Sequence, residues 1–322
     1  MDLAEGIRAG NRRALSRAIT LVESTRPDHR AEADALLREL GGERRALRIG
    51  LTGTPGVGKS TFTESFGLML IAQGLKLAVL AVDPSSARSG GSILGDKTRM
   101  ERLSREPHAF IRPSPAAAQL GGLARRSWEV ASLFDAAGFD IVIAETVGVG
   151  QSETAVAAMT DLFALLLAPA GGDELQGVKR GIMEVADLVL VNKADGDLAA
   201  QARATCADYA GALRLMRPRP GDPKGWPMAR TVSAMTGEGL EAAWEAMQAL
   251  TDHRRATGAL DRTRRAQAVA RFDEEVRATL LSRLQSDPSL AERRAALAEE
   301  VAAGRPPAEA AAALLDGAHP PA

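Results

Sequence analysis

Short apolar runs alternate with longer amphipathic stretches along the middle of the chain. Runs typical of buried strands occur at 47–51, 77–82, 140–144, 162–167 and 188–191. Between them, the stretches 61–73 and 120–136 have apolar residues at helical spacing. Strands separated by helices pair in parallel and form a sheet that is covered on both faces. The pattern therefore predicts an α/β fold with a mostly parallel central sheet.

Helical patterns without strands flank this region. Before it, residues 2–23 and 36–40 have apolar side chains at helical spacing, and we expect short helices packed on the neighbouring domain. After it, residues 240–250 are helical in pattern, and an apolar stripe follows at Val269, Phe272, Val276, Leu280 and Leu284. The stripe either packs back on its own chain or, as we favour, pairs two copies in a homodimer. We expect an N-terminal helical extension (1–45), a central domain (46–250) and a C-terminal helical arm for dimerisation (251–322).

Composition narrows the functional classes. The 322 residues include 40 Lys+Arg and 41 Asp+Glu, so no basic surplus indicates nucleic-acid binding. The one cysteine, Cys206, cannot form an intramolecular disulfide, and the four histidines have no metal-ligand spacing. The N-terminus lacks a signal-peptide core, and no apolar run is long enough to span a bilayer. We expect a cytoplasmic protein that binds neither nucleic acid nor membrane.

A glycine-rich motif, GTPGVGKS, joins the strand 47–51 to a helix at residues 53–60. Its glycines let backbone N–H groups surround a phosphate, and the helix N-terminus adds its positive end. Lys59 can reach the β- and γ-phosphates, and the Ser60 hydroxyl can bind Mg²⁺. A glycine-rich turn without a ligand is the alternative, which the strand and helix context disfavours. We expect nucleotide binding by Gly53, Thr54, Pro55, Gly56, Val57, Gly58, Lys59, Ser60 and Thr61.

A second motif, NKAD at residues 192–195, follows the strand 188–191 and is typical of guanine recognition. The Asp195 carboxylate can accept from the ring N–H and the amine of guanine, whereas adenine offers neither donor. Asn192 would tie this loop to the phosphate loop or to the base, and the Lys193 stem would lie over the ring. Ser233 and Ala234 follow an apparent strand, where we expect a backbone N–H for the guanine carbonyl. A capping turn explains four such residues in isolation, but their order along the chain favours GTP and GDP.

Acidic residues between the two motifs are candidates for positioning Mg²⁺. Asp83 ends the second strand, and Asp96 lies in the glycine-rich stretch that follows; both could hold or orient the ion, although Asp96 could be a surface charge. Glu145 ends the strand 140–144 in the Walker B position, where a carboxylate acts on Mg²⁺ through water. The N–H of Gly148 can sense the γ-phosphate. Together with Ser60, these residues predict a magnesium site.

The residue after Gly148 is unusual for a GTPase. Small signalling GTPases have a glutamine there that orients the attacking water, whereas this chain has Val149, and Gln151 follows two positions later. We therefore expect slow intrinsic hydrolysis. A cation brought by a partner or by loop closure could supply the missing stabilisation. Lys179 and Arg180 are the nearest candidates, and a solvated basic pair that caps a helix is the alternative.

In their order along the chain, these motifs resemble the MeaB-type GTPases, also called ArgK in some bacteria, which are G-protein chaperones associated with methylmalonyl-CoA mutase. Further matching stretches are DPSSARSGGSILGDKTRM (83–100), ETVGVGQSE (145–153), GGDELQGVKRG (171–181), SAMTGEG (233–239) and HRRATGALDRTRRAQ (253–267). The resemblance implies a P-loop NTPase domain of the SIMIBI class with N-terminal helices and a C-terminal dimerisation arm. It also implies GTP hydrolysis that gates adenosylcobalamin loading into an acyl-CoA mutase and protects that mutase. Residues 173–180 would be a third switch that contacts the mutase, which supports a functional role for Lys179.

Two other functions could use the same phosphate loop. A GTP-driven metallochaperone that inserts nickel would need Cys and His ligands near the switches, and one cysteine with four separated histidines argues against it. A small-molecule kinase would transfer the γ-phosphate to an acceptor. The guanine motif and the lack of an evident acceptor pocket disfavour that reading.

Overall fold

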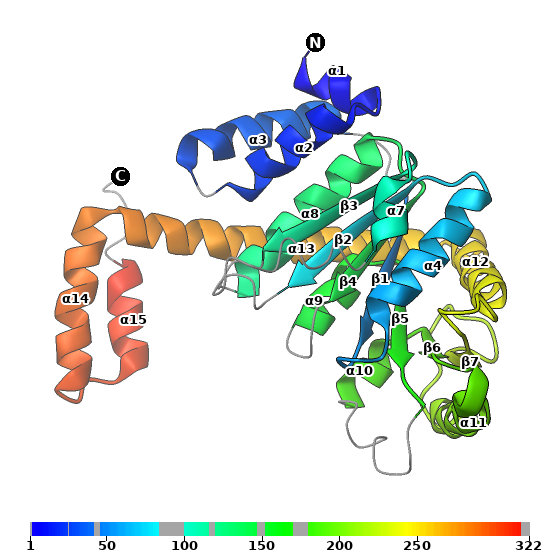
Figure 1. Cartoon of the computed structure of the whole chain (residues 1–322). Helices are drawn as coiled ribbons and strands as arrows, with labels where there is room; N and C mark the ends of the chain where they lie inside the picture. The colour runs from blue at the N-terminus through cyan, green and yellow to red at the C-terminus, as the bar shows by residue number, and fades with distance from the viewer. Residues whose placement is uncertain are drawn as a thin grey trace. The chain divides into compact units, whose positions relative to one another are not determined.

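The computed structural model of the chain describes residues 2–24, 26–41, 46–83, 100–115, 120–146, 152–169 and 180–316. A seven-stranded sheet forms its centre, in the order β3-β2-β4-β1-β5-β6-β7 (Figure 1). Every neighbouring pair is parallel, which confirms the predicted α/β class. The strands are β1 (Leu47–Gly53), β2 (Leu77–Asp83), β3 (Ala109–Pro115), β4 (Ile141–Thr146), β5 (Leu162–Leu167), β6 (Leu188–Val191) and β7 (Met228–Thr231).

The edge strand β3 is the strand that the apolar pattern does not predict. Its sequence, AFIRPSP, contains Pro113 and Pro115, which have no N–H group to donate to a neighbouring strand. In the described sheet β3 pairs with β2 alone, so these prolines do not interrupt a second ladder. Prolines make a stretch look like a loop in sequence, although an edge strand tolerates them.

Helices cover both faces of the sheet, and alternate strand residues contribute to each face. In β4, Ile141 and Ile143 join the cluster that includes α4, whereas Val142 and Ala144 join the cluster that includes α8. Burial on both faces explains why these strands read as continuous apolar runs. One face carries α4 (Lys59–Ala72), α7 (Glu101–Arg105) and α12 (Leu240–Ala256). The other carries α8 (Leu120–Ala136), α9 (Ser152–Met159), α10 (Arg180–Val185) and α11 (Ala199–Arg214).

Three N-terminal helices, α1 (Leu3–Arg8), α2 (Arg12–Glu23) and α3 (Pro27–Leu40), lie against α8 (Figure 1). Ile19 and Val22 of α2 belong to the same apolar cluster as Phe134 of α8. Arg30 of α3 adds an ion pair to the buried Glu129 of α8, with 2.7 Å between Nη2 and Oε1. The expected packing of these helices on the neighbouring domain is therefore confirmed.

An aspartate stands directly before each of three strands and holds the start of a neighbouring strand. Asp161, before β5, donates its N–H to the Arg48 carbonyl at 2.8 Å and accepts from the Arg48 N–H through Oδ2 at 2.9 Å. Asp187, before β6, makes the same two bonds to Phe163 at 2.7 and 2.8 Å. Asp140, before β4, makes them to Lys76 at 3.0 and 2.8 Å. We call this two-bond arrangement the aspartate clasp.

The chain divides into two compact units, Met1–Gln267 and Ala268–Ala322. Helix α13 (Ala259–Ser286) begins in the first unit and ends in the second, which also contains α14 (Pro288–Ala302) and α15 (Pro307–Asp316). Leu297 of α14 and Ala310 of α15 are buried, and Arg293 donates to the Ala313 carbonyl at 2.7 Å. Helices α14 and α15 therefore form a packed hairpin.

The longest described helix is α13, with 28 residues. Within the described ranges, no helix combines the length and apolar character needed to cross a membrane.

Candidate functional site

The phosphate loop lies where predicted, between β1 and α4. Gly56 and Gly58 have positive φ values of 81° and 88°, which glycine adopts without strain. At Gly53 a Cβ atom would lie 2.2 Å from the Leu166 carbonyl oxygen, so a larger residue would push β1 and β5 apart. Val57 is buried and anchors the loop to the core. The loop conformation thus depends on glycine at three of its positions.

Lys59, Ser60 and Thr61 form the first turn of α4, directly after this loop. The Lys59 ammonium group lies over the loop and donates to the carbonyls of Gly53 at 2.6 Å and Thr54 at 3.1 Å. The helix N-terminus and the Lys59 charge therefore face the same small region, as binding of an anionic phosphate requires.

Asn192 connects the phosphate loop to the two loops predicted to read the base. Its side chain is buried, donates through Nδ2 to the Val57 carbonyl at 2.9 Å and accepts through Oδ1 from the Ala234 N–H at 3.0 Å. A Cβ atom at Gly58 would lie 2.8 Å from this Nδ2 atom, so glycine there permits the approach. Lys193 adds a bond from Nζ to the Gly56 carbonyl at 2.8 Å. Three segments far apart in sequence thus meet at one edge of the sheet.

Asp195 and Ser233 lie together in this cluster, with 2.6 Å between the Asp195 Oδ1 atom and the Ser233 hydroxyl. The Ser233 hydroxyl also accepts from the Thr236 N–H at 3.1 Å, which fixes the loop that follows β7. A neutral hydroxyl positions the Asp195 carboxylate here without neutralising its charge. The carboxylate keeps further acceptor capacity for two donors of a base.

The backbone N–H groups of Ser233 and Ala234 both have partners within the described chain. We expected a backbone N–H of Ser233 or Ala234 for the guanine carbonyl, but the Ser233 N–H donates to the Glu238 carbonyl and the Ala234 N–H to Asn192. The role of these two residues toward the guanine carbonyl stays a prediction.

Glu145 is buried in β4 beside the carboxyl ends of β1 and β2. The Thr63 hydroxyl of α4 donates to its Oε2 atom at 2.9 Å, and Thr63 is itself fully buried. The next residue, Thr146, shares a hydrogen bond of 2.8 Å between hydroxyl groups with Thr52 of β1. These oxygen atoms and the Ser60 hydroxyl are the hard donors that Mg²⁺ prefers, so the residues present fit such an ion.

The remaining predicted residues are described in part or not at all. Asp83 is the last residue of β2, with only its backbone described. Asp96, Gly148 and Lys179 lie outside the described residues, as do the stretches 84–99, 147–151 and 170–179 that hold the predicted switches. The structure thus brings together the phosphate loop, the guanine motif and Glu145.

Comparison with known proteins identifies the family of the chain. A family model described as methylmalonyl-CoA mutase-associated GTPase MeaB matches residues 15–289. The chain belongs to the MeaB family. A probable GTPase of Mycobacterium bovis is 49% identical to it, over 98% of this chain and 94% of the relative. The mitochondrial methylmalonic aciduria type A homolog of mouse is 46% identical, over 97% of this chain and 78% of its own length.

A crystal structure of a LAO/AO transport system kinase has the same fold, with a TM-score of 0.75 and 36% identity over 98% of this chain and 95% of that one. The family description and the mycobacterial relative both name a GTPase. This MeaB-family chain is accordingly a GTPase, and its catalytic domain contains the motifs that the sequence singled out.

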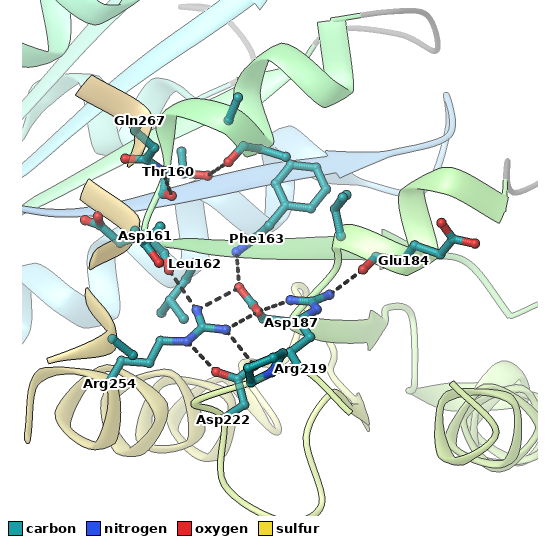
Figure 2. A pocket seen from close by; sticks show the side chains of 16 residues that line it. Thr160, Asp161, Leu162, Phe163, Glu184, Asp187, Arg219, Asp222, Arg254 and Gln267 are labelled. Atoms are coloured by element: carbon teal, nitrogen blue, oxygen red, sulfur yellow. Dashed lines mark hydrogen bonds and ion pairs between the residues drawn. The ribbon is translucent and has the colours of Figure 1, made fainter. Parts of the chain in front are cut away.

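The opposite edge of the sheet contains a cavity of about 430 Å³ that sequence reasoning did not predict (Figure 2). Its charged lining residues are Asp161 and Asp187, which stand directly before β5 and β6, Glu184 of α10, Arg254 of α12, and Arg219 and Asp222 of the segment before β7. Arg254 binds Asp187 at 2.6 Å and Asp222 at 2.7 Å, and Arg219 binds the same Asp187 at 2.6 Å (Figure 2). The pKa of Arg254 is raised, because these carboxylates outweigh the effect of its burial. The charges are paired with one another.

Asp161 is the centre of a second charge cluster at this edge. Its side chain is fully buried between Arg48 at 2.6 Å and Arg264 of α13 at 2.7 Å. Burial alone would raise the pKa of Asp161, but the hydrogen bond from Arg264 and the charge of Arg48 outweigh burial and lower it. Gln267 joins the cluster by accepting from Arg48 at 3.0 Å and donating to the Thr160 carbonyl at 2.7 Å. The start of α13 is thus fixed to β1 and β5.

Sequence reasoning missed several residues of this MeaB-family site. Thr63 and Ser65 carry no motif, yet Thr63 orients Glu145, and the Ser65 hydroxyl donates to the Ala234 carbonyl at 2.6 Å. Both lie within the first two turns of α4. The sequence pattern of this helix is mainly apolar, so it does not indicate a role for single hydroxyl groups. For Asp161 and Asp187 a signal did exist: each aspartate stands directly before a buried apolar strand.

Proposed function

We propose that this MeaB-family GTPase binds GTP with Mg²⁺ at the carboxyl edge of the sheet and acts as a chaperone of an adenosylcobalamin-dependent acyl-CoA mutase. In this role, GTP hydrolysis gates loading of adenosylcobalamin into the mutase and protects it. One observation carries the nucleotide part: the Asn192 side chain bonds both Val57 of the phosphate loop and Ala234 of the base loop. The family description, which names methylmalonyl-CoA mutase, supports the partner.

Each group at the site has a proposed role in hydrolysis. Lys59 exchanges the carbonyls of Gly53 and Thr54 for oxygens of the β- and γ-phosphates, where its charge stabilises the transition state. Ser60 and Glu145, with Asp83 and Asp96, hold or orient Mg²⁺, which when bound neutralises phosphate charge. The buried Glu145 keeps its orientation because Thr63 donates to it at 2.9 Å.

Two further residues act at the γ-phosphate in this proposal. The Gly148 N–H senses that phosphate, and Lys179 brings the cation that the missing glutamine makes necessary. Val149 in place of that glutamine supports slow basal turnover. The rate should then rise when a partner brings the Lys179 ammonium group to the γ-phosphate.

Calorimetric titration with GTP, GDP and ATP tests the nucleotide. Asp195 accepts from two guanine donors, and adenine would leave the carboxylate unpaired, so we expect GTP and GDP to bind at least about 100-fold more tightly than ATP. ATP affinity equal to that of GTP would contradict the assignment of Asn192 and Asp195. Release of inorganic phosphate without any added acceptor separates a GTPase from a small-molecule kinase.

GTP turnover with and without a purified acyl-CoA mutase tests the partner. We expect a complex and faster turnover when the mutase is present. Lys179→Ala should reduce the stimulated rate more than the basal rate, and Lys224→Ala, at an exposed position outside the site, is the matched control. If the mutase neither binds nor stimulates, the chaperone function is wrong although GTP hydrolysis remains.

We also propose that the arm pairs two copies. Val269, Phe272 and Leu280 of α13 are 61%, 65% and 54% exposed, which is unusual for large apolar side chains on one helix. Phe272→Glu should shift the sedimentation of the protein from dimer to monomer, whereas Leu315→Glu on α15 should not. A monomeric native protein would contradict the dimer.

The predicted division into 1–45, 46–250 and 251–322 stays part of this proposal, and so does the cytoplasmic location. The lone Cys206 supports a reducing compartment, because it cannot form an intramolecular disulfide. Fractionation of the source cells tests the location, and limited proteolysis tests the boundaries.

A further inference from the structure

A second hollow, of about 610 Å³, lies between the last turn of α10 and the end of α11. Apolar side chains form most of its wall, from Met183 of α10, Ala212 of α11 and the segment that follows α11. Glu184 and Arg219 line this hollow and the charged cavity alike, so the two are neighbours. Its volume lies in the range of binding pockets, and its lining is mainly apolar with a few charges.

Leu215 is the conspicuous residue of this hollow. It caps the C-terminus of α11 and is 89% exposed, more than any other large apolar side chain among the described residues. Met216 and Pro227 extend the apolar surface beside it. Any polar residue would serve as well at a helix end in water, so the fold itself does not require leucine there.

Charge on the rim restricts what can occupy the hollow. Arg214 and Arg217 directly flank the pair Leu215-Met216, and both are exposed. Arg219 is held by Asp187 and by the Ala186 carbonyl at 2.7 Å. Arg214 and Arg217, by contrast, make no side-chain hydrogen bond or ion pair with any part of the chain that the structure describes. A complementary ligand therefore presents an apolar side chain next to one or more carboxylates.

We propose that this hollow receives an apolar side chain, flanked by acidic residues, from the acyl-CoA mutase. The inference rests on the proposed function and adds a docking surface to it. The position of α10 supports this occupant: the helix begins directly after residues 170–179, which contain the proposed coupling residue Lys179, and Met183 and Glu184 of its last turn line the hollow. A mutase segment seated there contacts the helix that carries this stretch. The concave shape suits a side chain better than a flat lipid surface.

Binding of the full-length chain to the purified mutase tests the proposal, with GTP present. Leu215→Glu places a carboxylate against the acidic ligand and should weaken the complex about 30-fold or more, as loss of a central contact does. Arg217→Glu should weaken it about 10-fold, with a smaller effect at high salt. Basal GTP hydrolysis and the melting temperature should stay at wild-type values, because both side chains are exposed and neither belongs to the phosphate loop or the loops that Asn192 joins to it.

Arg203→Glu is the matched control. Arg203 lies on the same helix and is exposed, but 11 residues before Arg214, which is about 16 Å along a helix. This variant should bind the mutase within about two-fold of wild type, because it carries the same charge change away from the hollow.

The possible failures differ in their signatures. A wild-type complex that Leu215→Glu and Arg217→Glu leave unchanged overturns the docking surface and leaves the proposed function standing. No wild-type complex at all overturns the mutase partnership and this surface with it. A change in the oligomeric state of Leu215→Glu without mutase assigns the hollow to a second copy of the chain. If wild type sediments with phosphatidylserine vesicles and Arg217→Glu does not, the hollow belongs to a membrane-binding surface. Either the change in oligomeric state or the vesicle result overturns the proposal.

Discussion

The two edges of the sheet hold their loops together by different interactions. At the carboxyl edge, the phosphate and base loops meet through bonds of the Asn192 amide to Val57 and Ala234, and through a hydroxyl on Asp195. At the amino edge, buried carboxylates of Asp161 and Asp187 are each held by two arginines. One edge is joined mainly by uncharged donors and acceptors, and the other by charges.

The two kinds of interaction differ in the free energy that it costs to break them. A neutral hydrogen bond contributes about 1 kcal/mol net, so a loop held by a few of them can rearrange around a ligand. Separating a buried ion pair costs about 3–5 kcal/mol, because one charge is left without a partner. With the nucleotide at the carboxyl edge, as we propose, the sheet would rearrange at that edge and gain its rigidity at the amino edge. Changes at the two edges should consequently affect different properties.

The largest expected effect is on stability, at the amino edge. Asp161→Ala leaves Arg48 and Arg264 without their shared carboxylate and should lower the free energy of unfolding by about 3–5 kcal/mol. Urea unfolding followed by circular dichroism measures this. Asp252→Ala, in an exposed pair with Arg255, should lower it by about 0–1 kcal/mol. The GTP hydrolysis rate per folded Asp161→Ala molecule should stay close to wild type.

The stability of the protein at acidic pH should also depend on the Asp161 carboxylate. The folded-state pKa of Asp161 is lowered, so its contribution is present above the unfolded value near 4 and is lost as pH falls through the folded value. Below about pH 4 the wild type should lose stability faster than Asp161→Asn, which has no proton to gain there. Parallel acid curves for the two proteins would contradict the ion-pair role.

The next effect is on catalysis, at the carboxyl edge. Lys59→Ala removes the charge over the phosphate loop and should reduce GTP hydrolysis by about 100- to 1,000-fold, as loss of a transition-state donor does. Its melting temperature should stay within a few degrees of wild type, since the Lys59 ammonium bonds carbonyls of the loop rather than groups of the apolar core. Hydrolysis at the wild-type rate would show that Lys59 has no role in the reaction.

A specificity change should follow at Asp195. Asp195→Asn replaces an acceptor of two guanine donors with a group that is part donor, so GTP affinity should fall by about 100-fold. Xanthosine triphosphate, which presents a carbonyl where guanine has its amine, should bind the variant better than wild type. Calorimetric titration of wild type and the variant with GTP and xanthosine triphosphate measures this change in nucleotide preference. An unchanged order of affinities would show that Asp195 does not face the base.

The smallest of these effects should come from Thr63, which positions Glu145 from α4. Thr63→Val keeps the shape but removes the hydroxyl donor, and we expect hydrolysis to fall about 10-fold and to need more Mg²⁺ for half-maximal rate. Thr63→Ser restores the donor and should restore the magnesium dependence. Equal magnesium curves for Val and Ser would mean that Thr63 is only a packing residue.

The sequence revealed the carboxyl edge better than the amino edge. GTPGVGKS and NKAD are contiguous motifs whose chemistry depends on neighbouring residues, so Lys59, Asn192 and Asp195 could be found by reading along the chain. The charged partners of Asp161 are Arg48 and Arg264. Arg48 precedes Asp161 in the sequence by about 100 residues, and Arg264 follows it by about 100 residues. Only the folded sheet brings those charges together.

The strands show the same limit. Runs such as LFALLL in β5 have a pattern strong enough to predict the strand and its bounds. In β3 the prolines obscured the pattern, because the tolerance of proline depends on whether a strand lies at the edge, and edge position is a property of the whole sheet. Thr63 was missed for a related reason: its role depends on the distance between α4 and β4.

The aspartate clasp also determines how the strands align. Shifting β5 by one residue against β1 would separate Asp161 from Arg48 and turn every β5 side chain to the opposite face. Asp187 sets the same condition for β6 against β5. A misaligned sheet would bury an unpaired carboxylate in either case, at a cost of several kcal/mol. The clasps of Asp161 and Asp187 therefore favour one register during folding, among strands that the chain must bring together from far apart.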